Sequence, residues 1–324
     1  MTDSSQHWRP TASLDVLKKR AELLRQIRAF FYARDVLEVD TPALSAAGNT
    51  DPNIESFSTD YTGPGDANTL YLHTSPEFAM KRLLAADSGA IYQLCKVFRN
   101  GEAGRHHNPE FTMLEWYRPG FDHHKLMDEV AELINEVLGH KDIEKITYQQ
   151  AFVEHAGIDP LDTDSRALKQ CAQQHGLEQV IGVDDASVDE WLDLLMDQVI
   201  VPAFGKNRVF VYDYPASQAA LAKISSSDPR VAERFELLID GIEIANGFHE
   251  LTDADEQRRR FKAENSQRQK AGLAQLPIDE NLIAALENGI PDCAGIALGV
   301  ERLLMLLLSQ QNISNVMCFD TEHA

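Results

Sequence analysis

The chain has 324 residues and a net charge of −21, from 30 basic and 51 acidic side chains. This length can bury a sizeable core, and the acidic balance argues against general affinity for nucleic acid backbones or anionic membranes. The four cysteines form no C-x-x-C pair, which predicts reduced thiols and no zinc knuckle. No signal-peptide core or run of about 18 apolar residues occurs, so the expected compartment is the cytoplasm.

The first third of the chain begins with a helical pattern. Apolar spacing predicts a helix over 14–35, then a short strand in VLEVDTP and a loop over 43–69 with a turn at 63–68. After a short strand in YLHTS, Ser75 is expected to cap a helix that has Pro76 at its first position. Two extended runs, IYQLCKVF and EFTMLEWY, then flank the polar segment RNGEAGRHHNP.

The rest of the chain alternates helical and extended patterns. A helix is expected near 122–138, followed by a helical, polar stretch over 139–207 without a catalytic pattern. After the strand RVFVYDY, apolar alternation on both sides of Asp240-Gly241 predicts a two-residue hairpin. The last elements are helices over 254–270 and 279–288 and a strand–helix pair in AGIALGVERLLMLLL. The pattern predicts an α+β fold, with helices flanking an antiparallel sheet, in one domain over 1–324.

The polar tip between the two extended runs is the first candidate site. Arg99 could bind a phosphate through both arms of its guanidinium, and Phe111 could face a base. Asn100 and Asn108 could hydrogen-bond sugar or phosphate oxygens. A solvated hairpin tip is the alternative that composition alone favours.

The segment GIEIANGFHE is the second candidate site. Glu243 and Glu250 could hold Mg²⁺ on a triphosphate, because this ion prefers carboxylate oxygens and substrate phosphates. Seven residues apart on a flat strand, they would point to opposite faces, so the pairing requires a bulge. Asn246-Gly247 could supply it. Two surface glutamates are the alternative.

The segment GIALGVERLLML is the third candidate site. Gly295 and Gly299 allow close approach of a ligand, and Arg302 lies in the first turn of an apolar helix. Because the helix dipole favours anions there, either a ligand phosphate or an acidic side chain should compensate the charge of this arginine. For a lone arginine, an ion pair with an acidic side chain is the more common of the two. No P-loop, dinucleotide-binding glycine pattern or H-E-x-x-H motif occurs.

Taken in order, these segments resemble a known family. The helix with VLEVDTP, then FRNGEAGRHHNPEFTMLEWY and ALGVERLLML, resemble motifs 1, 2 and 3 of class II aminoacyl-tRNA synthetases of the lysyl type. GIEIANGFHELTD with Gln257, Arg260 and Phe261 is similar to the metal and amino-acid segment of that family. No anticodon-binding barrel fits before motif 1. The similarity is therefore strongest to truncated lysyl-type paralogues, through TSPE, DYPASQAALAKIS, ELTDADEQ and PDCAGIALG.

The resemblance implies an AMP-forming ligase that makes an aminoacyl-adenylate. It places adenine between Phe111 and Arg302, Arg99 on the α-phosphate and Mg²⁺ at Glu243 and Glu250, with Arg99 and Arg302 as the catalytic residues. The implied ATP-binding residues are Arg99, Asn100, Gly101, Asn108, Phe111, Glu243, Ile244, Gly299 and Arg302. The residues implied for the amino acid are Ser75, Pro76, Glu77, Tyr117, Glu250 and Ala297, with Glu77 and Glu250 pairing with the two amino groups.

The resemblance also implies partners. The truncated paralogues use (R)-β-lysine and a lysine ε-amino group of elongation factor P, without tRNA, and motif 1, with Pro42 and the helix over 14–35, implies a homodimer. Two alternatives stay open. A short lysyl-tRNA synthetase is disfavoured by the net charge and the missing barrel, and an inactive regulatory or amino-acid-sensing subunit is disfavoured because the motif arginines and glutamates are present.

The sequence departs from lysyl-tRNA synthetases at two positions. Gly101 replaces a motif 2 glutamate, with Glu102 one place later. Ala297 replaces a glycine, and its methyl would crowd an α-amino group. Because a change of this size is worth about 1–3 kcal/mol, we expect Ala297 to favour β-lysine.

Two histidine pairs invite a metal interpretation. No third ligand stands at a useful spacing from His106-His107 or His123-His124, so we assign the first pair to the loop and the second to the surface.

Overall fold

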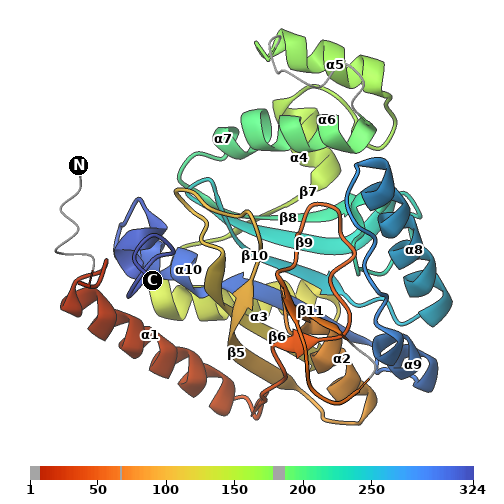
Figure 1. Ribbon diagram of the computed structural model, residues 1–324. Coiled ribbons are helices and arrows are strands. Elements are labelled where there is room, and N and C mark those ends of the chain that lie inside the picture. The colour runs from red at the N-terminus through yellow and green to blue at the C-terminus, as the bar shows by residue number, and fades with distance from the viewer. Residues whose placement is uncertain (1–7, 66–67, 178–186) are drawn as a thin grey trace. The chain divides into compact units, whose positions relative to one another are not determined.

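The computed structural model describes residues 8–65, 68–177 and 187–324 and divides into two compact units. The first unit comprises Met1–Gly120, Glu132–Gly139 and Thr252–Ala324, and the second comprises Phe121–Ala131 and His140–Leu251. The predicted α+β class is confirmed, because both units combine helices with sheet strands (Figure 1). A single domain over 1–324 stays a prediction.

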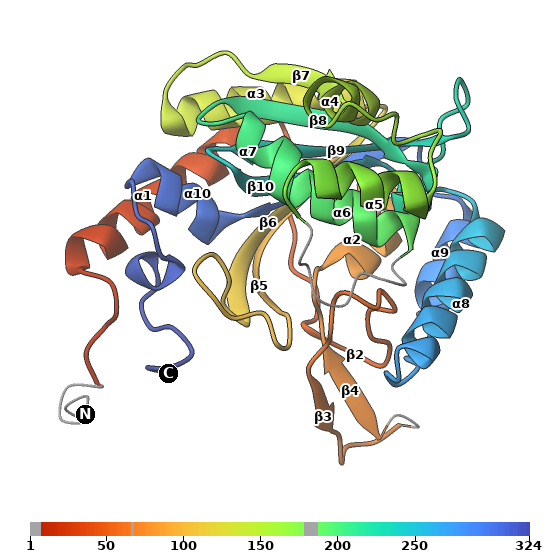
Figure 2. The ribbon, with the colours of Figure 1, turned by 90° about the horizontal axis from the view of Figure 1, so that it is seen from above.

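The first unit is built on four strands in the order β1-β5-β6-β11. These are β1 (Leu37–Glu38), β5 (Ile91–Phe98), β6 (Glu110–Pro119) and β11 (Cys293–Gly299). Its helices are α1 (Leu14–Tyr32), α2 (Glu77–Ala85), α8 (Ala254–Lys270), α9 (Glu280–Asn288) and α10 (Val300–Leu307). A small separate sheet contains β2 (Leu44–Ser45), β4 (Thr69–Leu72) and β3 (Ser58–Asp60) (Figure 2). The long β5–β6 hairpin is antiparallel, and only the short β1 runs parallel to its neighbour β5.

The second unit is built on four strands in the order β10-β9-β8-β7. These are β7 (Glu144–Thr147), β8 (Arg208–Pro215), β9 (Val231–Ile239) and β10 (Ile242–His249). Its helices are α4 (Tyr148–His155), α5 (Ser165–Gln174), α6 (Val188–Leu195) and α7 (Val201–Ala203), with a π-helical turn at Met196–Ile200. Helix α3 (His123–Leu138) contributes its first turns to this unit and its last turns to the first unit. The β9–β10 hairpin forms as predicted, because Asp240 and Gly241 both take the positive φ of a two-residue turn (53° and 75°).

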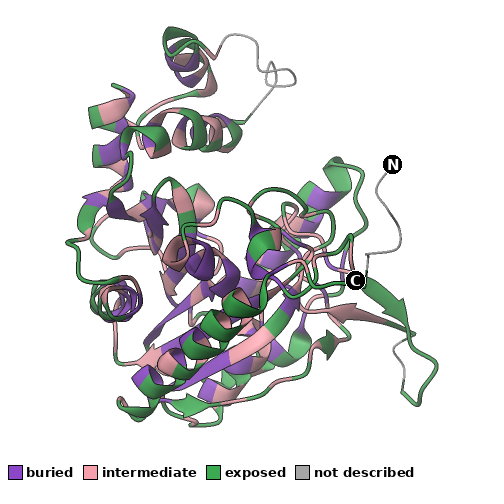
Figure 3. Cartoon of the chain, turned by 90° about the vertical axis from the view of Figure 1, so that its left-hand side faces the viewer, coloured by how far each residue is buried: buried purple, intermediate pink, exposed green. Residues whose placement is uncertain are grey.

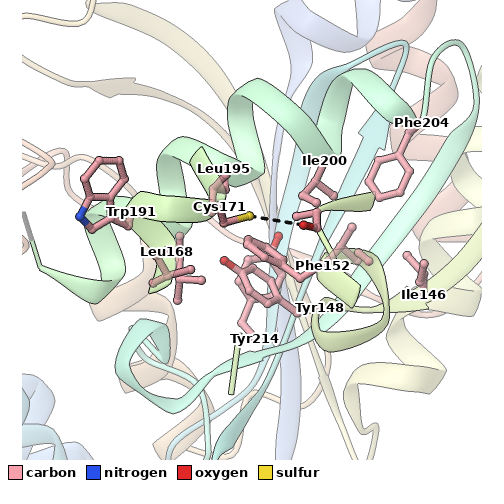
Figure 4. Close-up of a cluster of buried hydrophobic side chains, with 14 of the residues drawn as sticks. Ile146, Tyr148, Phe152, Leu168, Cys171, Trp191, Leu195, Ile200, Phe204 and Tyr214 are labelled. Atoms are coloured by element: carbon pink, nitrogen blue, oxygen red, sulfur yellow. Dashed lines mark hydrogen bonds between the residues drawn. The ribbon is translucent and has the colours of Figure 1, made fainter. Parts of the chain in front are cut away.

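A buried apolar cluster holds the helices of the second unit against its strands (Figure 4). The Tyr148 ring stacks on Phe152 with centroids 4.6 Å apart, and Tyr214 packs beside Tyr148 at 4.8 Å. The Cys171 thiol donates to the carbonyl of Ala156. Within its described residues, the stretch 139–207 is therefore amphipathic and includes a strand, which corrects the interpretation as helical and polar. In Figure 3 the long strands carry most of the buried residues, the short strands β1 to β4 are exposed or intermediate, and the helices combine buried and exposed residues.

Three features of the first unit differ from the sequence predictions. Helix α1 ends at Tyr32, before Asp35, which takes a left-handed φ of 53° that a helix cannot contain. Pro76 is the cap of α2 and not its first residue, while the Ser75 hydroxyl accepts from the amide of Glu77. The predicted loop over 43–69 contains β2 and β3 and ends in β4. Part of the predicted turn at 63–68 lies outside the described residues.

Candidate active site

The tip of the β5–β6 hairpin is an ordered loop. The Arg99 amide donates to the carbonyl of Pro109 at 2.8 Å, and Gly104 and His107 exchange backbone hydrogen bonds across the tip. Arg105 donates through Nε to the Gln311 carbonyl at 2.8 Å, which attaches the loop to the segment after α10. Backbone and side-chain contacts therefore order the tip, but most of its residues are exposed to solvent, so a solvated hairpin tip stays an alternative.

Arg99 and Phe111 lie together at the base of this loop. The Arg99 guanidinium carbon is 5.3 Å from the centroid of the Phe111 ring, a cation–π distance. Its Nε donates to the carbonyl of Thr74 at 3.4 Å. Two residues assigned to ATP by resemblance are thus neighbours, with the guanidinium side chain only one quarter exposed.

The motif 2 departure has a backbone explanation. Gly101 takes a φ of +81°, where any L side chain is strained even though no atom lies within 4 Å of its would-be Cβ. The next residue, Glu102, places a carboxylate oxygen 3.8 Å from Arg99 Nη1. Glu102 therefore supplies the carboxylate beside the motif 2 arginine that Gly101 cannot supply.

Arg302 of α10 contacts the motif 2 loop. Its Nε donates to the His106 carbonyl at 3.3 Å, and its Nη2 lies 2.6 Å from His107 Nε2. Because a guanidinium only donates, that His107 nitrogen is the acceptor. Gly299 is the N-cap of α10, so the strand-to-helix turn sets the position of Arg302 beside the loop.

A buried polar triad joins the three motif segments. Glu301, only 2% exposed, accepts from the Thr112 amide at 2.8 Å and from Arg20 at 3.3 Å. Arg20 also donates to the Thr112 hydroxyl at 2.7 Å. Since α1, β6 and α10 each provide one member, the triad fixes these elements relative to one another within the first unit.

The two asparagines of the loop differ. Asn108 is buried and has both amide atoms engaged: Nδ2 donates to the Glu110 carbonyl at 2.7 Å, and Oδ1 accepts from Thr321. Asn100 is exposed, and its backbone amide donates to the Glu55 carbonyl. Asn108 therefore has a structural function that is sufficient to explain it, and ATP contact by either residue stays a prediction.

Three residues assigned to the amino acid surround a carboxylate that sequence reasoning missed. Glu115, 2% exposed, accepts from the Ser75 hydroxyl and from the Tyr117 hydroxyl, each at 2.7 Å. Ala297 on β11 is its register partner. Ser75, Tyr117 and Ala297 thus converge on one buried acidic group, which is suited to a cationic substrate.

Glu77, the glutamate of this unit that was predicted from the sequence, already forms an ion pair. The Glu77 carboxylate accepts from Lys81 one helical turn later, at 2.7 Å, and the lysine is 1% exposed. Helix α8 brings a second acid near this pair. Burial raises the pKa of Glu264 to about 7, the charges of Asp51 and Glu77 add to the shift, and Thr50 donates to its carboxylate.

Helix α8 also carries the Q-x-x-R-F residues. Phe261 packs on Phe78 with centroids 5.6 Å apart, and Arg260 pairs with Glu256. Gln257 is 1% exposed, and neither polar atom of its side chain finds a hydrogen-bond partner in the described part of the chain. A buried amide in this state can bind a polar ligand without first breaking an internal bond.

A bulge in β10 determines the faces of the second unit. Glu243 pairs with Leu238 but Ala245 pairs with Leu237, so Ile244 is an extra residue. The bulge is therefore at Ile244 and not at the predicted Asn246-Gly247, which keeps regular register. The side chain of Ile244 is buried, at 2% exposure.

The bulge puts the two candidate metal ligands on one face. With one residue extra, Glu243 and Glu250 have the same orientation relative to the sheet, together with Asn246. Glu243 is exposed and Glu250 is 1% exposed. Oxygen donors on one face are the set that Mg²⁺ prefers, so these residues fit that ion.

Two further charged residues share this face. Arg234 donates to Glu236, to the Gln218 carbonyl at 2.8 Å and to Asn246 at 3.3 Å. Burial raises the pKa of Glu236 above its ordinary value, although Arg234 opposes the shift. The predicted residues Glu243, Ile244 and Glu250 belong to this second unit, whereas all the other predicted site residues belong to the first.

Glu115, Glu264 and Arg234 were not identified from the sequence. A charged residue inside an apolar strand, such as Glu115 in EFTMLEWY, is the available signal, because such residues are rarely buried without a partner. This signal does not identify the partner residues. Ala297 lies beside Glu115 because of the strand register, and Ser75 does so because of the turn before α2, and neither contact follows from local sequence.

The family of this chain follows from comparison with known proteins. Residues 3–323 match the family described as tRNA synthetases class II (D, K and N). The chain therefore belongs to the class II tRNA synthetase family.

Curated relatives are more specific. A protein of Vibrio cholerae serotype O1 is 56% identical over 98% of both chains, and one of Pectobacterium atrosepticum is 53% identical over 98% of both. A protein of Salmonella typhi is 50% identical with the same coverage. Each of the three carries the name elongation factor P–(R)-β-lysine ligase.

The raised pKa of Glu264 predicts a pH-dependent stability. The folded protein holds the Glu264 proton more tightly than the unfolded chain does. The resulting contribution to the free energy of unfolding is therefore complete below pH 4.5 and is lost as the pH rises through about 7. Glu264→Gln removes it. Relative to the variant, the wild-type free energy of unfolding should fall by about 2–3 kcal/mol between pH 5 and pH 8, as measured by urea denaturation. Glu287→Gln, at an exposed site of α9, is the matched control; an equal pH response in all three proteins would contradict the assignment.

Proposed function

We propose that the chain activates (R)-β-lysine with ATP and transfers it to a lysine ε-amino group of elongation factor P. The observation that carries this proposal is the convergence of Ser75, Tyr117 and Ala297 on the buried Glu115 carboxylate. The relatives named for this reaction match nearly the full chain at 50–56% identity, which supports the same chemistry here.

The reaction has two balanced steps. A carboxylate oxygen of β-lysine attacks the α-phosphorus of ATP, the bond to the β,γ-phosphates breaks, and pyrophosphate leaves. The ε-amine nitrogen of the acceptor lysine then attacks the adenylate carbonyl, AMP leaves with the bonding pair, and the amide nitrogen releases a proton. No nucleophilic side chain is needed, so the enzyme acts by positioning and by neutralising charge.

The first unit would bind the ATP and the amino acid. Arg99 would contact the α-phosphate, Phe111 and Arg302 would hold the adenine between them, and Gly299 would also contact the ATP. Asn100, Asn108 and the Gly101 backbone are the remaining predicted ATP contacts in this unit. The pairing of Arg99 with Glu102 at 3.8 Å is long enough to open when a phosphate binds.

Charged side chains would hold the diamino substrate. We propose Glu115 as an additional acidic contact, because Lys81 already neutralises Glu77 in the first unit. Pro76 would shape the pocket wall. In the second unit, Glu250 keeps its proposed contact with a substrate amino group.

Magnesium is the proposed cofactor. Glu243 and Glu250 would hold it, with the backbone of Ile244 as a further ATP contact. When bound, the ion neutralises phosphate charge and so favours departure of pyrophosphate.

The remaining partner assignments are also proposals. No described helix has the length and apolar character needed to cross a bilayer, and we propose a cytoplasmic enzyme. Helix α1 exposes Leu14 and Tyr32, at 70% and 85%, and Pro42 is exposed beyond it. Exposed apolar groups on this segment support a homodimer through motif 1. The acidic charge of −21 supports action without tRNA.

The proposal predicts a mass change of the acceptor. Elongation factor P of the same organism, incubated with the enzyme, Mg-ATP and (R)-β-lysine, should gain one lysyl residue in intact-mass spectrometry. Arg302→Ala should slow this gain by roughly 10²-fold or more, the usual loss when a charge-stabilising donor is removed. Glu154→Gln, an exposed glutamate of α4, should leave the rate unchanged.

Each other outcome identifies a rival. Formation of AMP and a charged lysine tRNA without a heavier acceptor protein would favour a short synthetase. No pyrophosphate exchange with any lysine isomer would favour an inactive regulatory or sensing subunit. Either result would overturn the proposed function.

The Ala297 methyl predicts the isomer preference. Because Ala297 is the register partner of Glu115, its methyl lies beside the proposed amino-group contact. Ala297→Gly should therefore improve the use of α-lysine relative to (R)-β-lysine by about 10-fold or more, measured as the ratio of kcat/KM in pyrophosphate exchange. An unchanged ratio would exclude the methyl as a selectivity element.

A further inference from the structure

The second unit contains a cluster of metal-ligand side chains outside the proposed active site. His123 at the start of α3, Glu233 on β9 and His249 at the end of β10 each offer an atom, and these atoms all lie within 4.8 Å of one another. His123 and His249 are 5% and 6% exposed. The assignment of the His123-His124 pair to the surface is therefore correct for the exposed His124 and wrong for His123.

The cluster lies on the face of the sheet opposite to Glu243 and Glu250. Phe248 is the register partner of Arg234, so both point to the Glu243 face, and their neighbours His249 and Glu233 point to the other. The contact between His249 Nδ1 and Glu233 Oε2 agrees with this register. The cluster is thus separate from the magnesium site proposed above.

His123 is the group that demands an explanation. Both ring nitrogens are buried, and neither has a hydrogen-bond partner in the described part of the chain. Nδ1 faces Glu233 Oε2 at 3.9 Å, and Nε2 faces Asp213 Oδ1 at 3.3 Å. Leaving a buried polar group without a hydrogen bond costs roughly 1–3 kcal/mol. The His249–Glu233 contact alone would explain those two residues, but not this imidazole.

A backbone irregularity aims Asp213 at this imidazole. The β8–β9 register shifts between Tyr212 and Tyr214: two residues of β9, Glu233 and Arg234, lie opposite the single residue Asp213, whose φ is +58°. A left-handed aspartate inside a strand is strained, and such strain concentrates at functional sites. Bulges also redirect side chains. One oxygen of this carboxylate therefore lies 3.3 Å from Nε2 of His123. In the tautomer that carries its hydrogen on Nε2, the lone pair of Nδ1 is available to a metal ion.

We propose that His123, Glu233 and His249 form a binding site for a divalent transition-metal ion of the zinc type. Two imidazoles and one carboxylate are a common ligand set for zinc, and nitrogen ligands disfavour Mg²⁺ and Ca²⁺. Asp213 is a positioning residue, because a histidine that binds metal usually donates its other N–H to a carboxylate. Zinc bound by three protein ligands commonly takes a water molecule as its fourth ligand.

The ion would join four segments of the second unit. It links the first turn of α3 to β9 and β10, and through Asp213 to β8. Since His249 directly precedes Glu250, fixing its ring also fixes the chain direction at the end of β10. This inference does not rest on the proposed ligase activity.

The test is zinc binding by the full chain. After removal of metals, the protein is titrated with Zn²⁺ against a chromophoric chelator, and Co²⁺ is added separately for its visible absorption spectrum. The wild type should bind one Zn²⁺ with submicromolar affinity, and bound Co²⁺ should absorb as a four- or five-coordinate ion. His123→Ala and His249→Ala should each weaken Zn²⁺ binding by at least 100-fold. Asp213→Asn should weaken it by about 10–100-fold while keeping the stoichiometry.

Two controls separate this site from other binding. His140→Ala removes an exposed histidine of the same unit, and Glu243→Gln removes a carboxylate of the opposite face; both should bind Zn²⁺ like the wild type. Glu233→Gln keeps the side-chain shape, so a loss of binding with unchanged circular dichroism assigns the loss to the ligand and not to misfolding. The proposal is overturned if the wild type binds no stoichiometric Zn²⁺. It is equally overturned if the His123, His249 and Glu233 variants bind it unchanged, or if Glu243→Gln alone abolishes binding.

Discussion

The single extra residue in β10 is the constraint on which both proposed metal sites depend. Without Ile244, Glu243 and Glu250 would lie on opposite faces of the second unit's sheet, as their odd spacing requires. With it, the two carboxylates share a face, and His249 is directed to the other, beside Glu233. One backbone irregularity thus places the oxygen ligands of the proposed magnesium site on one face of the sheet and the nitrogen and oxygen ligands of the proposed zinc-type site on the other.

Buried charge organises the first unit in a comparable way. Glu301 joins Arg20 and Thr112, and Arg268, fully buried on α8, binds Glu55 at 2.7 Å. Each of these ion pairs has one buried member, Glu301 or Arg268, and losing its partner would leave that buried charge uncompensated. These networks hold the loop and α10 in place, which would reduce the reorganisation needed for the phosphate contacts proposed for Arg99 and Arg302.

Long, periodic elements could be predicted from the sequence, and long-range pairings could not. The helix over 254–270 and the Asp240-Gly241 hairpin follow from local spacing and turn chemistry. A bulge was expected because two glutamates stand an odd number of residues apart, and it was assigned to Asn246-Gly247 because glycine in a strand often marks a bulge. The extra residue is instead the buried Ile244. His123 was assigned to the surface because its neighbours Glu233 and His249 are distant in the chain and approach it only through the sheet.

The central claim is that Glu243 and Glu250 hold one ion on the same face, and a double-mutant cycle tests it most directly. Pyrophosphate exchange with (R)-β-lysine would be measured over a range of Mg²⁺ concentrations for Glu243→Gln, Glu250→Gln and the double variant. If both residues act on one ion, the double variant should lose little more activity than the more severe single variant, because residues that act as a unit are not additive. Losses that multiply, with an unchanged Mg²⁺ requirement in the single variants, would contradict the account.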